Sequence, residues 1–372
     1  MDRYFIWGCK ECGKKVYDLL AKEKKEIIAF VDSDKEKQGG NYCGITIISP
    51  EEAVQRAKEN ECDAIVFAFL NFHQRNATRL FKDINIEGYV VPTHIQKFKP
   101  TFDSMKECLV KIDLTKPRMK QFDVNLVDHC NMKCKGCLRF SNLVTDPLYA
   151  DFYQMIKDWK RIKELFWGVE RIKLMGGEPL LNPDLCKYIK AAREIFPDAD
   201  IMVTTNALLL NDRCQELFDT MKDNNCFFDI SLYEPMTKRI DEVERILDDN
   251  KVWYTVNNTK GDFYKVMSPI PKYDADRMYE VCMAKNCHHL REGKISVCSR
   301  PQYAHIINER YGVSIPTDSG VWDIYDDNID AWDLDEKLSS SFEACKYCAP
   351  PVSYEWGRAD DKTAQYEDWF VE

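Results

Sequence analysis

The chain has 372 residues, of which 45% are hydrophobic and 31% are charged, and its formal net charge is −10. This composition is typical of a soluble globular protein of two or three domains, and the negative charge argues against nucleic acid as the main partner. The sequence shows neither an apolar run of about 18 residues, which a membrane span needs, nor a signal peptide. The 16 cysteines therefore indicate a reducing cytoplasm and metal ligation rather than disulfides.

The first hundred residues have the pattern of a small Rossmann-like domain. Four short apolar runs predict buried strands, at residues 3–8, 26–31, 63–69 and 88–91. A turn bounded by Gly8 and Gly13 follows the first strand, and Asp32 follows the second, as in nucleotide-binding folds. Lys10 stands where the dinucleotide fingerprint has its middle glycine, so a dinucleotide is not expected.

The ligand of this domain stays open. Residues 30–34 and 48–52 resemble the N-terminal domains of sugar-modifying acyltransferases and related surface-polysaccharide enzymes, which bind nucleotide sugars. A purely structural or subunit-contact role is the alternative. Residues 101–120, with Pro117 and several lysines, are expected to form a linker.

Three cysteines with C-x3-C-x2-C spacing follow a predicted strand at residues 122–127. They are Cys130, Cys134 and Cys137. Thiolates at this spacing can converge on one iron–sulfur cluster, and three ligands leave one iron of a [4Fe–4S] cluster open to a small molecule. A zinc knuckle or three unrelated thiols is the alternative, but structural zinc usually has four closed protein ligands.

A glycine motif downstream strengthens the cluster interpretation. It consists of Gly176, Gly177, Glu178 and Pro179. Together with the three cysteines it resembles the radical SAM superfamily, over about residues 118–275. The resemblance implies that S-adenosylmethionine (SAM) binds at the open iron, and that a 5′-deoxyadenosyl radical removes hydrogen from a substrate. It also implies that the glycine motif holds the amino group of SAM, with Glu178 as an acceptor.

The region around these motifs alternates strands and helices. An amphipathic helix is expected at residues 151–169, and strands are expected at residues 171–175, 200–206, 227–233 and 252–257. The resemblance makes this region, residues 121–275, a partial (β/α)6 barrel in an α/β chain. Ligands of such folds lie at the carboxyl ends of the strands, where Thr205, Asn206, Ser231 and Asn257 stand. By resemblance the first three contact SAM; loop capping is the alternative.

The last region, residues 276–372, contains five further cysteines: Cys282, Cys287, Cys298, Cys345 and Cys348. A two-residue turn at Glu292 and Gly293 predicts a hairpin in which Arg291 opposes Lys294, and this register extended outward brings Cys287 opposite Cys298. The later CxxC pair can supply two more ligands. The two histidines after Cys287 are expected at a surface strand position.

This region resembles the auxiliary-cluster modules called SPASM and twitch, because Gly293 and Cys298 match their G-x4-C spacing. The resemblance implies a second [4Fe–4S] cluster. Family spacing favours Cys282 as its first ligand and the hairpin favours Cys287; we lean to Cys287 and keep both open. A zinc site is the alternative.

The pattern as a whole predicts a radical SAM enzyme that oxidises a carbohydrate or nucleotide-sugar, in keeping with surface-polysaccharide biosynthesis, with a flavodoxin- or ferredoxin-type electron donor. A sugar epimerase, a sugar dehydratase, a peptide maturase and a non-catalytic iron–sulfur or zinc protein are the alternatives. A maturase would usually carry a leader-recognition domain, which the N-terminal pattern does not resemble.

Overall fold

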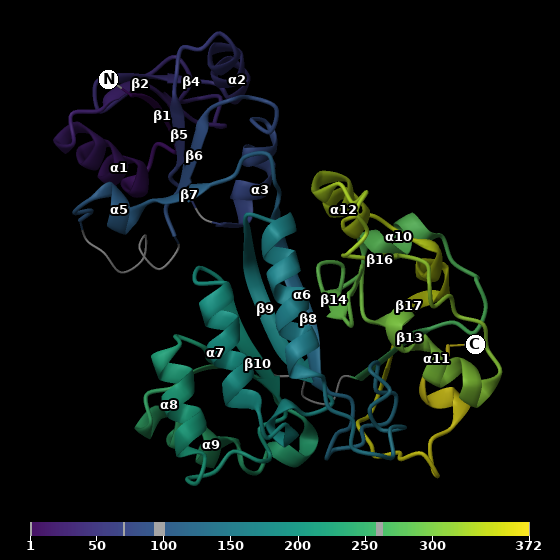
Figure 1. Ribbon diagram of the computed structural model, residues 1–372. Helices are drawn as coiled ribbons and strands as arrows, with labels where there is room; N and C mark the ends of the chain where they lie inside the picture. Colours follow the sequence, from purple (N-terminus) through teal and green to yellow (C-terminus); the bar gives the residue numbers. More distant parts are fainter. Residues whose placement is uncertain (1, 70, 93–100, 258–262, 372) are drawn as a thin grey trace. The chain divides into compact units, whose positions relative to one another are not determined.

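The structure is a computed structural model, and it describes residues 2–69, 71–92, 101–257 and 263–371. The chain folds into two compact units (Figure 1). Unit 1 comprises residues 1–120 and 165–170, and unit 2 comprises residues 121–164 and 171–372.

Unit 1 is built on a seven-stranded sheet with the order β3-β4-β2-β1-β5-β6-β7. The strands are β1 (Arg3–Trp7), β2 (Glu26–Val31), β3 (Asn41–Tyr42), β4 (Ile45–Ile48), β5 (Ala64–Phe67), β6 (Glu87–Val90) and β7 (Val110–Ile112). The five central strands are parallel, and β3 and β7 run antiparallel at the edges. The helices are α1 (Glu11–Lys22), α2 (Pro50–Lys58), α3 (Asn71–Arg79) and α5 (Met105–Cys108).

Both faces of this sheet carry an apolar core, as continuous apolar strands of a parallel sheet require. Along β1, Tyr4 and Ile6 belong to one buried cluster and Phe5 and Trp7 to the other. The four strands expected from the sequence are β1, β2, β5 and β6. The segment expected as a linker supplies α5 and β7 instead of a simple crossing, because Val110–Ile112 pairs with β6.

The turn before α1 explains why residues 8 and 13 are glycines. A Cβ on Gly13 would lie 1.9 Å from the Gly8 carbonyl oxygen, so only glycine lets the helix start so close to β1. Asp32 accepts hydrogen bonds from the backbone N–H of Cys9 at 3.3 Å and from Lys37 Nζ at 3.0 Å. This carboxylate is therefore used to hold the loop together.

Unit 2 contains an eight-stranded sheet with the order β12-β11-β10-β9-β8-β14-β15-β16. The strands are β8 (Arg118–Val127), β9 (Gly168–Gly176), β10 (Asp200–Thr205), β11 (Phe227–Ser231), β12 (Trp253–Asn257), β14 (His288–Arg291), β15 (Lys294–Ser296) and β16 (Val321–Asp323). The pairs β9–β10, β10–β11, β11–β12 and β8–β14 are parallel. Five of the six strands from β12 to β14 are those expected at residues 121–275, and the sixth, β14, comes from the region assigned to the C-terminal module.

Helices follow the strands as the alternation predicts. They are α6 (Phe152–Leu165), α7 (Leu185–Ile195), α8 (Gln215–Asp223), α9 (Ile240–Asp249), α10 (Ala275–Glu280), α11 (Arg300–Tyr311) and α12 (Ala331–Leu338). Short 3-10 turns are η1 (Pro179–Leu181), η2 (Glu234–Met236), η3 (Glu343–Tyr347) and η4 (Tyr366–Asp368). The helix expected at residues 151–169 ends earlier, because Gly168 already begins β9.

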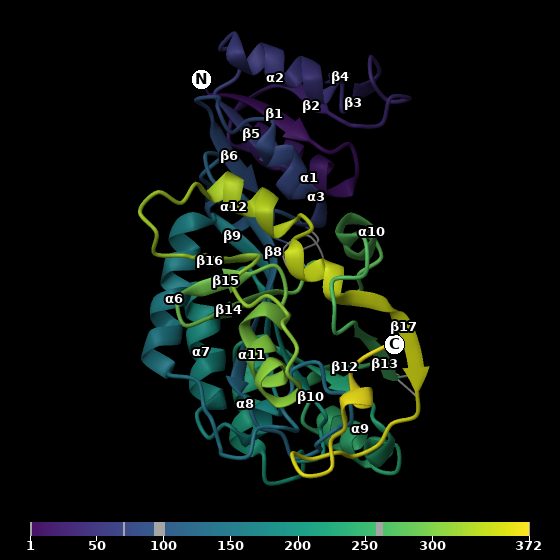
Figure 2. The same cartoon turned by 90° about the vertical axis from the view of Figure 1, so that its right-hand side faces the viewer.

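A second, two-stranded sheet in unit 2 pairs β13 (Phe263–Met267) with β17 (Cys348–Tyr354), antiparallel (Figure 2). The chain after β17 ends in a buried cluster that includes Trp369, Phe370 and Met267 from the tail and β13. The C-terminal residues are therefore part of the core of unit 2. In the described part of the chain, helices are all too short or too polar to cross a lipid bilayer.

Candidate active site

One cavity of about 510 Å³ brings the two groups of cysteines together within unit 2. Cys130, Cys134 and Cys137 line one part of it, and Cys282 and Cys348 line another. Most other lining side chains are apolar; they include Met132, Leu138, Met175, Phe263, Val266, Met278, Val281 and Met283. A cavity of this size with few polar groups is typical of a small-molecule site.

The first cysteine group lies on the loop that leaves the carboxyl end of β8. All three thiols line the cavity and are partly buried. Burial raises the pKa of Cys130 to about 12 and that of Cys134 to about 11. Thiols ligate iron only as thiolates, so loading this site must release their protons. Three thiols with no fourth cysteine on the loop fit a [4Fe–4S] cluster with one open iron.

The backbone of the glycine motif packs directly against the backbone that leads into the cysteine loop. A Cβ on Gly176 would lie 2.1 Å from the Val127 carbonyl oxygen, and one on Gly177 would lie 1.9 Å from the His129 carbonyl oxygen. Gly177 N–H donates to Val127 O at 2.9 Å. The glycines therefore allow the end of β9 to pack directly on the backbone that leads into Cys130, which fixes the start of the cysteine loop.

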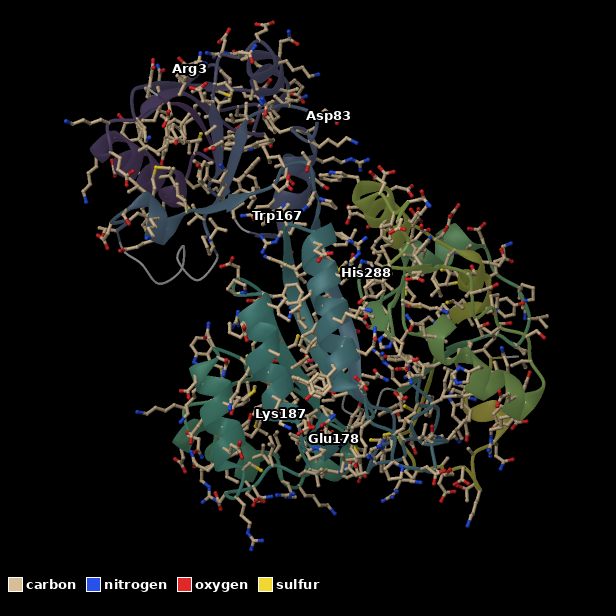
Figure 3. All side chains as sticks on the ribbon, viewed as in Figure 1. Arg3, Asp83, Trp167, Glu178, Lys187 and His288 are labelled. Carbon is tan, nitrogen blue, oxygen red and sulfur yellow. The ribbon has the colours of Figure 1, made fainter. Side chains whose placement is uncertain are left out.

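Glu178 is fully buried, and protein groups satisfy its carboxylate (Figure 3 labels this residue). Oε1 accepts from the Thr205 hydroxyl at 2.6 Å and from Leu180 N–H at 3.1 Å, and Oε2 accepts from Asn206 N–H at 2.8 Å. Burial raises the pKa of Glu178 to about 7, although these hydrogen bonds oppose the shift. Pro179 begins η1 directly after it. The acceptor role toward SAM stays a prediction.

The polar residues expected at the strand ends reach the site to different degrees. Thr205, Asn206 and Ser231 line the cavity. Asn206 Nδ2 also donates to Asn131 Oδ1 at 2.8 Å, which ties the end of β10 to the cysteine loop. Asn257 Nδ2 donates to Asp229 Oδ1, and it does not line the cavity. The first three positions are therefore available to a ligand, as the resemblance implies.

Four of the five C-terminal cysteines form the second group: Cys282, Cys298, Cys345 and Cys348. The Cys345 and Cys348 thiols share a hydrogen bond, which lowers the pKa of Cys348. Cys298 interacts electrostatically with Cys348 and Cys282, and burial raises its pKa to about 11. These residues come from the α10–β14 connection, the end of β15 and the η3–β17 junction. Four thiols from three segments fit the ligand set of a second cluster.

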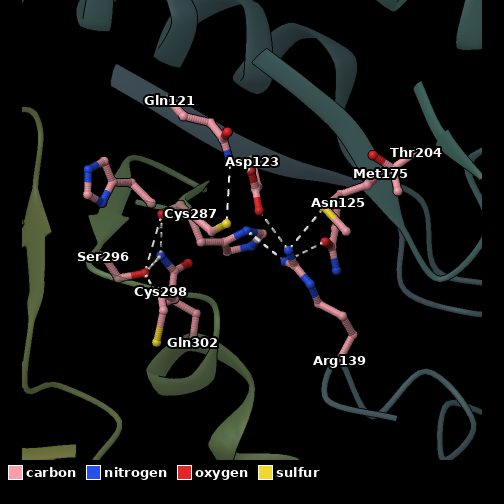
Figure 4. A network of polar contacts seen from close by, with 12 residues as sticks. Gln121, Asp123, Asn125, Arg139, Met175, Thr204, Cys287, Ser296, Cys298 and Gln302 are labelled. Carbon is pink, nitrogen blue, oxygen red and sulfur yellow. Dashed lines mark hydrogen bonds and ion pairs between the residues drawn. The ribbon is translucent and has the colours of Figure 1, made fainter. Parts of the chain in front are cut away.

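The Cys287 sulfur lies beside the Gln121 side chain, as Figure 4 shows. Its sulfur accepts from Gln121 Nε2 at 3.4 Å, and burial followed by the nearby Asp123 raises its pKa. The hairpin register is confirmed, since Arg291 opposes Lys294 and His289 opposes Ser296. The paired register ends at His289 and Ser296, so the ladder does not extend outward to Cys287 and Cys298. The placement of Cys287 beside Gln121 favours Cys282 as the first ligand of the second cluster.

The two histidines of β14 are buried, contrary to the expected surface position. His289 contacts Arg139 Nη1 at 3.0 Å through Nδ1 (Figure 4), and burial followed by the charge of Arg139 lowers its pKa well below the usual value. Arg139 also donates to Asp123 Oδ2 and Met175 Sδ, both at 3.1 Å. This network fixes the Arg139 side chain where it meets the cavity.

Sequence reasoning missed two arginines of the cavity wall, Arg139 and Arg300. Arg300 is partly buried, and its Nη1 donates to Cys348 Sγ at 2.6 Å. Each arginine stands two residues after a cysteine, Cys137 in one case and Cys298 in the other. This repeated C-x-R pattern could have pointed to both.

Among the described residues, no three His, Cys, Asp or Glu side chains meet closely enough to hold a single metal ion. An iron–sulfur cluster differs from a single ion in this respect, because each ligand binds a different iron atom and the sulfurs lie further apart. The two cysteine groups are therefore compared with clusters rather than with a mononuclear site.

Comparisons with known proteins match two parts of the chain. The model of the radical SAM superfamily matches residues 124–258, and that of the family described as C2185-like, N-terminal, matches residues 1–91. A protein named GTP 3′,8-cyclase from Clostridium botulinum is 30% identical over 141 residues, 37% of this chain and 42% of the relative. One of the same name from Sulfurimonas denitrificans is 36% identical over 104 residues, 26% of this chain and 30% of the relative. The chain thus spans less than half the length of these relatives.

Similar solved structures are distant. BtrN in complex with AdoMet and 2-DOIA has 13% identity and a TM-score of 0.40, over 69% of this chain and all of that one. UDP-D-quinovosamine 4-dehydrogenase from Vibrio fischeri has 19% identity and a TM-score of 0.27, over 30% of this chain and 97% of that one. The radical SAM superfamily implies SAM and one [4Fe–4S] cluster as cofactors. Residues 124–258, with their three-cysteine loop and glycine motif, therefore form a radical SAM domain.

Proposed function

We propose that the chain is a radical SAM enzyme that oxidises a hydroxyl group of a small sugar-type substrate held in the cavity of unit 2. The observation that carries this proposal is the lining of that cavity. Thiols of both cysteine groups face the same space, so a substrate there can lie between a radical source and an electron acceptor. The four thiols of the second group leave no open ligand position, which suits an acceptor better than a substrate-binding cluster.

When bound, SAM and its cluster supply a 5′-deoxyadenosyl radical, and a second cluster supplies an acceptor for one electron. The proposed reaction balances as SAM plus a secondary alcohol giving 5′-deoxyadenosine, methionine, a ketone and one proton. A flavodoxin- or ferredoxin-type donor provides the electron that starts each turnover, and the oxidation of the alcohol returns it.

The residues of this chain bind, orient and shield the reactants. Thr205, Asn206 and Ser231 offer hydroxyl and amide groups at the strand ends for SAM. Arg139 and Arg300 bring positive charge to the cavity lining, which suits substrate oxygen atoms. The methionines and aliphatic side chains of the lining exclude water, which limits side reactions of a radical.

Two arguments bear on the substrate class. The Rossmann-like unit 1 resembles domains that bind nucleotide sugars, which supports a sugar or nucleotide-sugar. The curated relatives named GTP 3′,8-cyclase make a purine nucleotide the second candidate. Epimerisation, dehydration and peptide modification are the rival reactions at the same kind of site.

The test is to incubate the anaerobically reconstituted chain with SAM, a reductant and a panel of sugars, nucleotide sugars and GTP, in deuterated water. Oxidation predicts a ketone two mass units lighter than the substrate, without carbon-bound deuterium, and one 5′-deoxyadenosine per product. A product of unchanged composition that carries carbon-bound deuterium contradicts oxidation and supports epimerisation. The control is a chain with Cys345→Ala and Cys348→Ala, which should lose product while it still cleaves SAM.

A further inference from the structure

The C-terminal segment lies along the first cysteine loop. We call residues 354–369 the C-terminal clamp. Lys135 N–H donates to the Gly357 carbonyl oxygen at 2.7 Å, and Ala359 N–H donates to the Lys133 carbonyl oxygen at 3.0 Å. These bonds flank an antiparallel bridge between Cys134 and Arg358. The loop therefore pairs with a segment more than two hundred residues further along the chain.

Side chains of the clamp hold the same loop. Tyr354 Oη donates to the Lys135 carbonyl oxygen at 2.7 Å, and Trp369 Nε1 donates to the Cys137 carbonyl oxygen at 2.9 Å. A Cβ on Gly136 would lie 2.4 Å from Tyr354 Oη, so a side chain at this position would push the clamp away. The glycine between the second and third cysteines is thus explained by the clamp.

One contact of the clamp reaches a sulfur atom directly. Trp356 Nε1 lies 3.3 Å from Cys134 Sγ, within hydrogen-bond distance for a sulfur acceptor. The indole N–H is a donor only, so the direction of this bond is unambiguous. A thiolate bound to iron carries more negative charge than a thiol, and it is therefore a stronger acceptor for the same N–H.

We propose that Trp356 is a positioning residue of the SAM-binding cluster, whose indole N–H donates to the Cys134 sulfur and favours the reduced state of that cluster. Hydrogen bonds to cluster sulfurs are among the factors that set the reduction potential, because they stabilise the form with more negative charge. The proposal rests on the assignment of Cys130, Cys134 and Cys137 as cluster ligands. It gives the C-terminal clamp a part in the electron uptake that starts the reaction.

The first test uses the natural chain, with tryptophan labelled by ¹⁵N at the indole nitrogen. The signal of the reduced SAM-binding cluster is selected as the one that shifts when SAM is added. Electron–nuclear double resonance at this signal should show a ¹⁵N coupling. The coupling should disappear in the labelled Trp356→Phe chain. Absence of the coupling in the natural chain overturns the proposal, and this measurement does not depend on how well any variant folds.

The second test measures the midpoint potential of the same SAM-responsive signal. A hydrogen bond that favours the reduced over the oxidised cluster by about tenfold raises a one-electron potential by about 59 mV. Trp356→Phe should therefore lower the potential, by about 59 mV for a preference of that size. Trp253→Phe is the matched control, since Trp253 is 73% exposed on β12. Equal potentials in the two variants overturn the proposal.

Failure of the cluster assignment gives a different result. If the SAM-responsive signal persists in a chain with Cys130→Ala, Cys134→Ala and Cys137→Ala, the ligand assignment is wrong. If the signal requires these cysteines but shows no ¹⁵N coupling, only the role of Trp356 is wrong.

Discussion

Replacement of Glu178 by glutamine should change SAM binding in a pH-dependent way. Among the described residues, the hydrogen-bond partners of the buried carboxylate are the Thr205 hydroxyl and the backbone N–H groups of Asn206 and Leu180, none of which is charged. Burial raises the pKa of Glu178 from 4.5 to about 7, which corresponds to about 3 kcal/mol in favour of the protonated form. A positively charged SAM bound next to Gly177 would favour the ionised form, so binding and loss of this proton are coupled.

The sign follows from the raised pKa. The Glu178 carboxylate is mostly ionised above pH 7 and becomes protonated as the pH falls through 7. Its contribution to SAM binding should therefore weaken as the pH falls. With a pKa of about 7, the ionised fraction falls about 25-fold between pH 7.5 and pH 5.5. The ratio of the dissociation constants of the Glu178→Gln and natural chains should therefore rise with pH, by up to about 25-fold between pH 5.5 and pH 7.5.

Equilibrium dialysis of SAM against the cluster-loaded chains under anaerobic conditions measures this ratio. Titration of the SAM amino group affects both chains equally, so the ratio isolates Glu178. Glu194→Gln, an exposed site on α7, is the matched control and should give a ratio of one throughout. A Glu178→Gln ratio that does not change with pH would refute the coupling.

Three further predictions concern the cysteine groups and the glycine motif. Cys282→Ser should reduce the iron held by the second cysteine group, while Cys287→Ser should not, because the Cys287 sulfur contacts Gln121. Iron analysis of both variants, in a chain that lacks Cys130, Cys134 and Cys137, measures this difference. Equal iron content in the two variants would contradict the prediction. Gly177→Ala should prevent the cysteine loop from closing and reduce iron uptake, because the added Cβ would lie 1.9 Å from His129 O. Gly168→Ala, at the start of β9 and with neighbouring atoms no closer than 3.8 Å, should load iron normally. Arg300→Gln should lower the reduction potential of the second cluster, because the positive charge beside Cys348 is lost. The control is Lys346→Gln, which should leave the potential unchanged because the Lys346 amine pairs with Glu343 at 2.8 Å. Redox titration detected by electron paramagnetic resonance measures both potentials.

Local patterns allowed much of the fold to be predicted. Continuous apolar runs marked the buried strands of unit 1, and the Glu292–Gly293 turn fixed the register of β14 and β15. The three-cysteine loop and the glycine motif could be recognised because their spacing lies within one segment of chain. These features depend on residues that are close in sequence.

What could not be predicted depends on contacts between distant segments. Cys287 was placed with Cys298 because the hairpin alone was visible, whereas its sulfur faces Gln121 on β8. The clamp was missed because no repeat or motif marks Trp356, and its bond to Cys134 joins positions 222 residues apart. Val110–Ile112 was assigned to a linker because a three-residue edge strand is too short to show periodicity.

The most direct test of the central claim, that one cavity serves two iron–sulfur clusters, is Mössbauer spectroscopy with iron and zinc analysis of the anaerobically reconstituted chain. The account predicts about eight irons in two [4Fe–4S] clusters, of which SAM perturbs one. The chain with Cys130→Ala, Cys134→Ala and Cys137→Ala should keep about four irons and lose the response to SAM. Zinc in the second cysteine group, or a natural chain with a single cluster, would contradict the account.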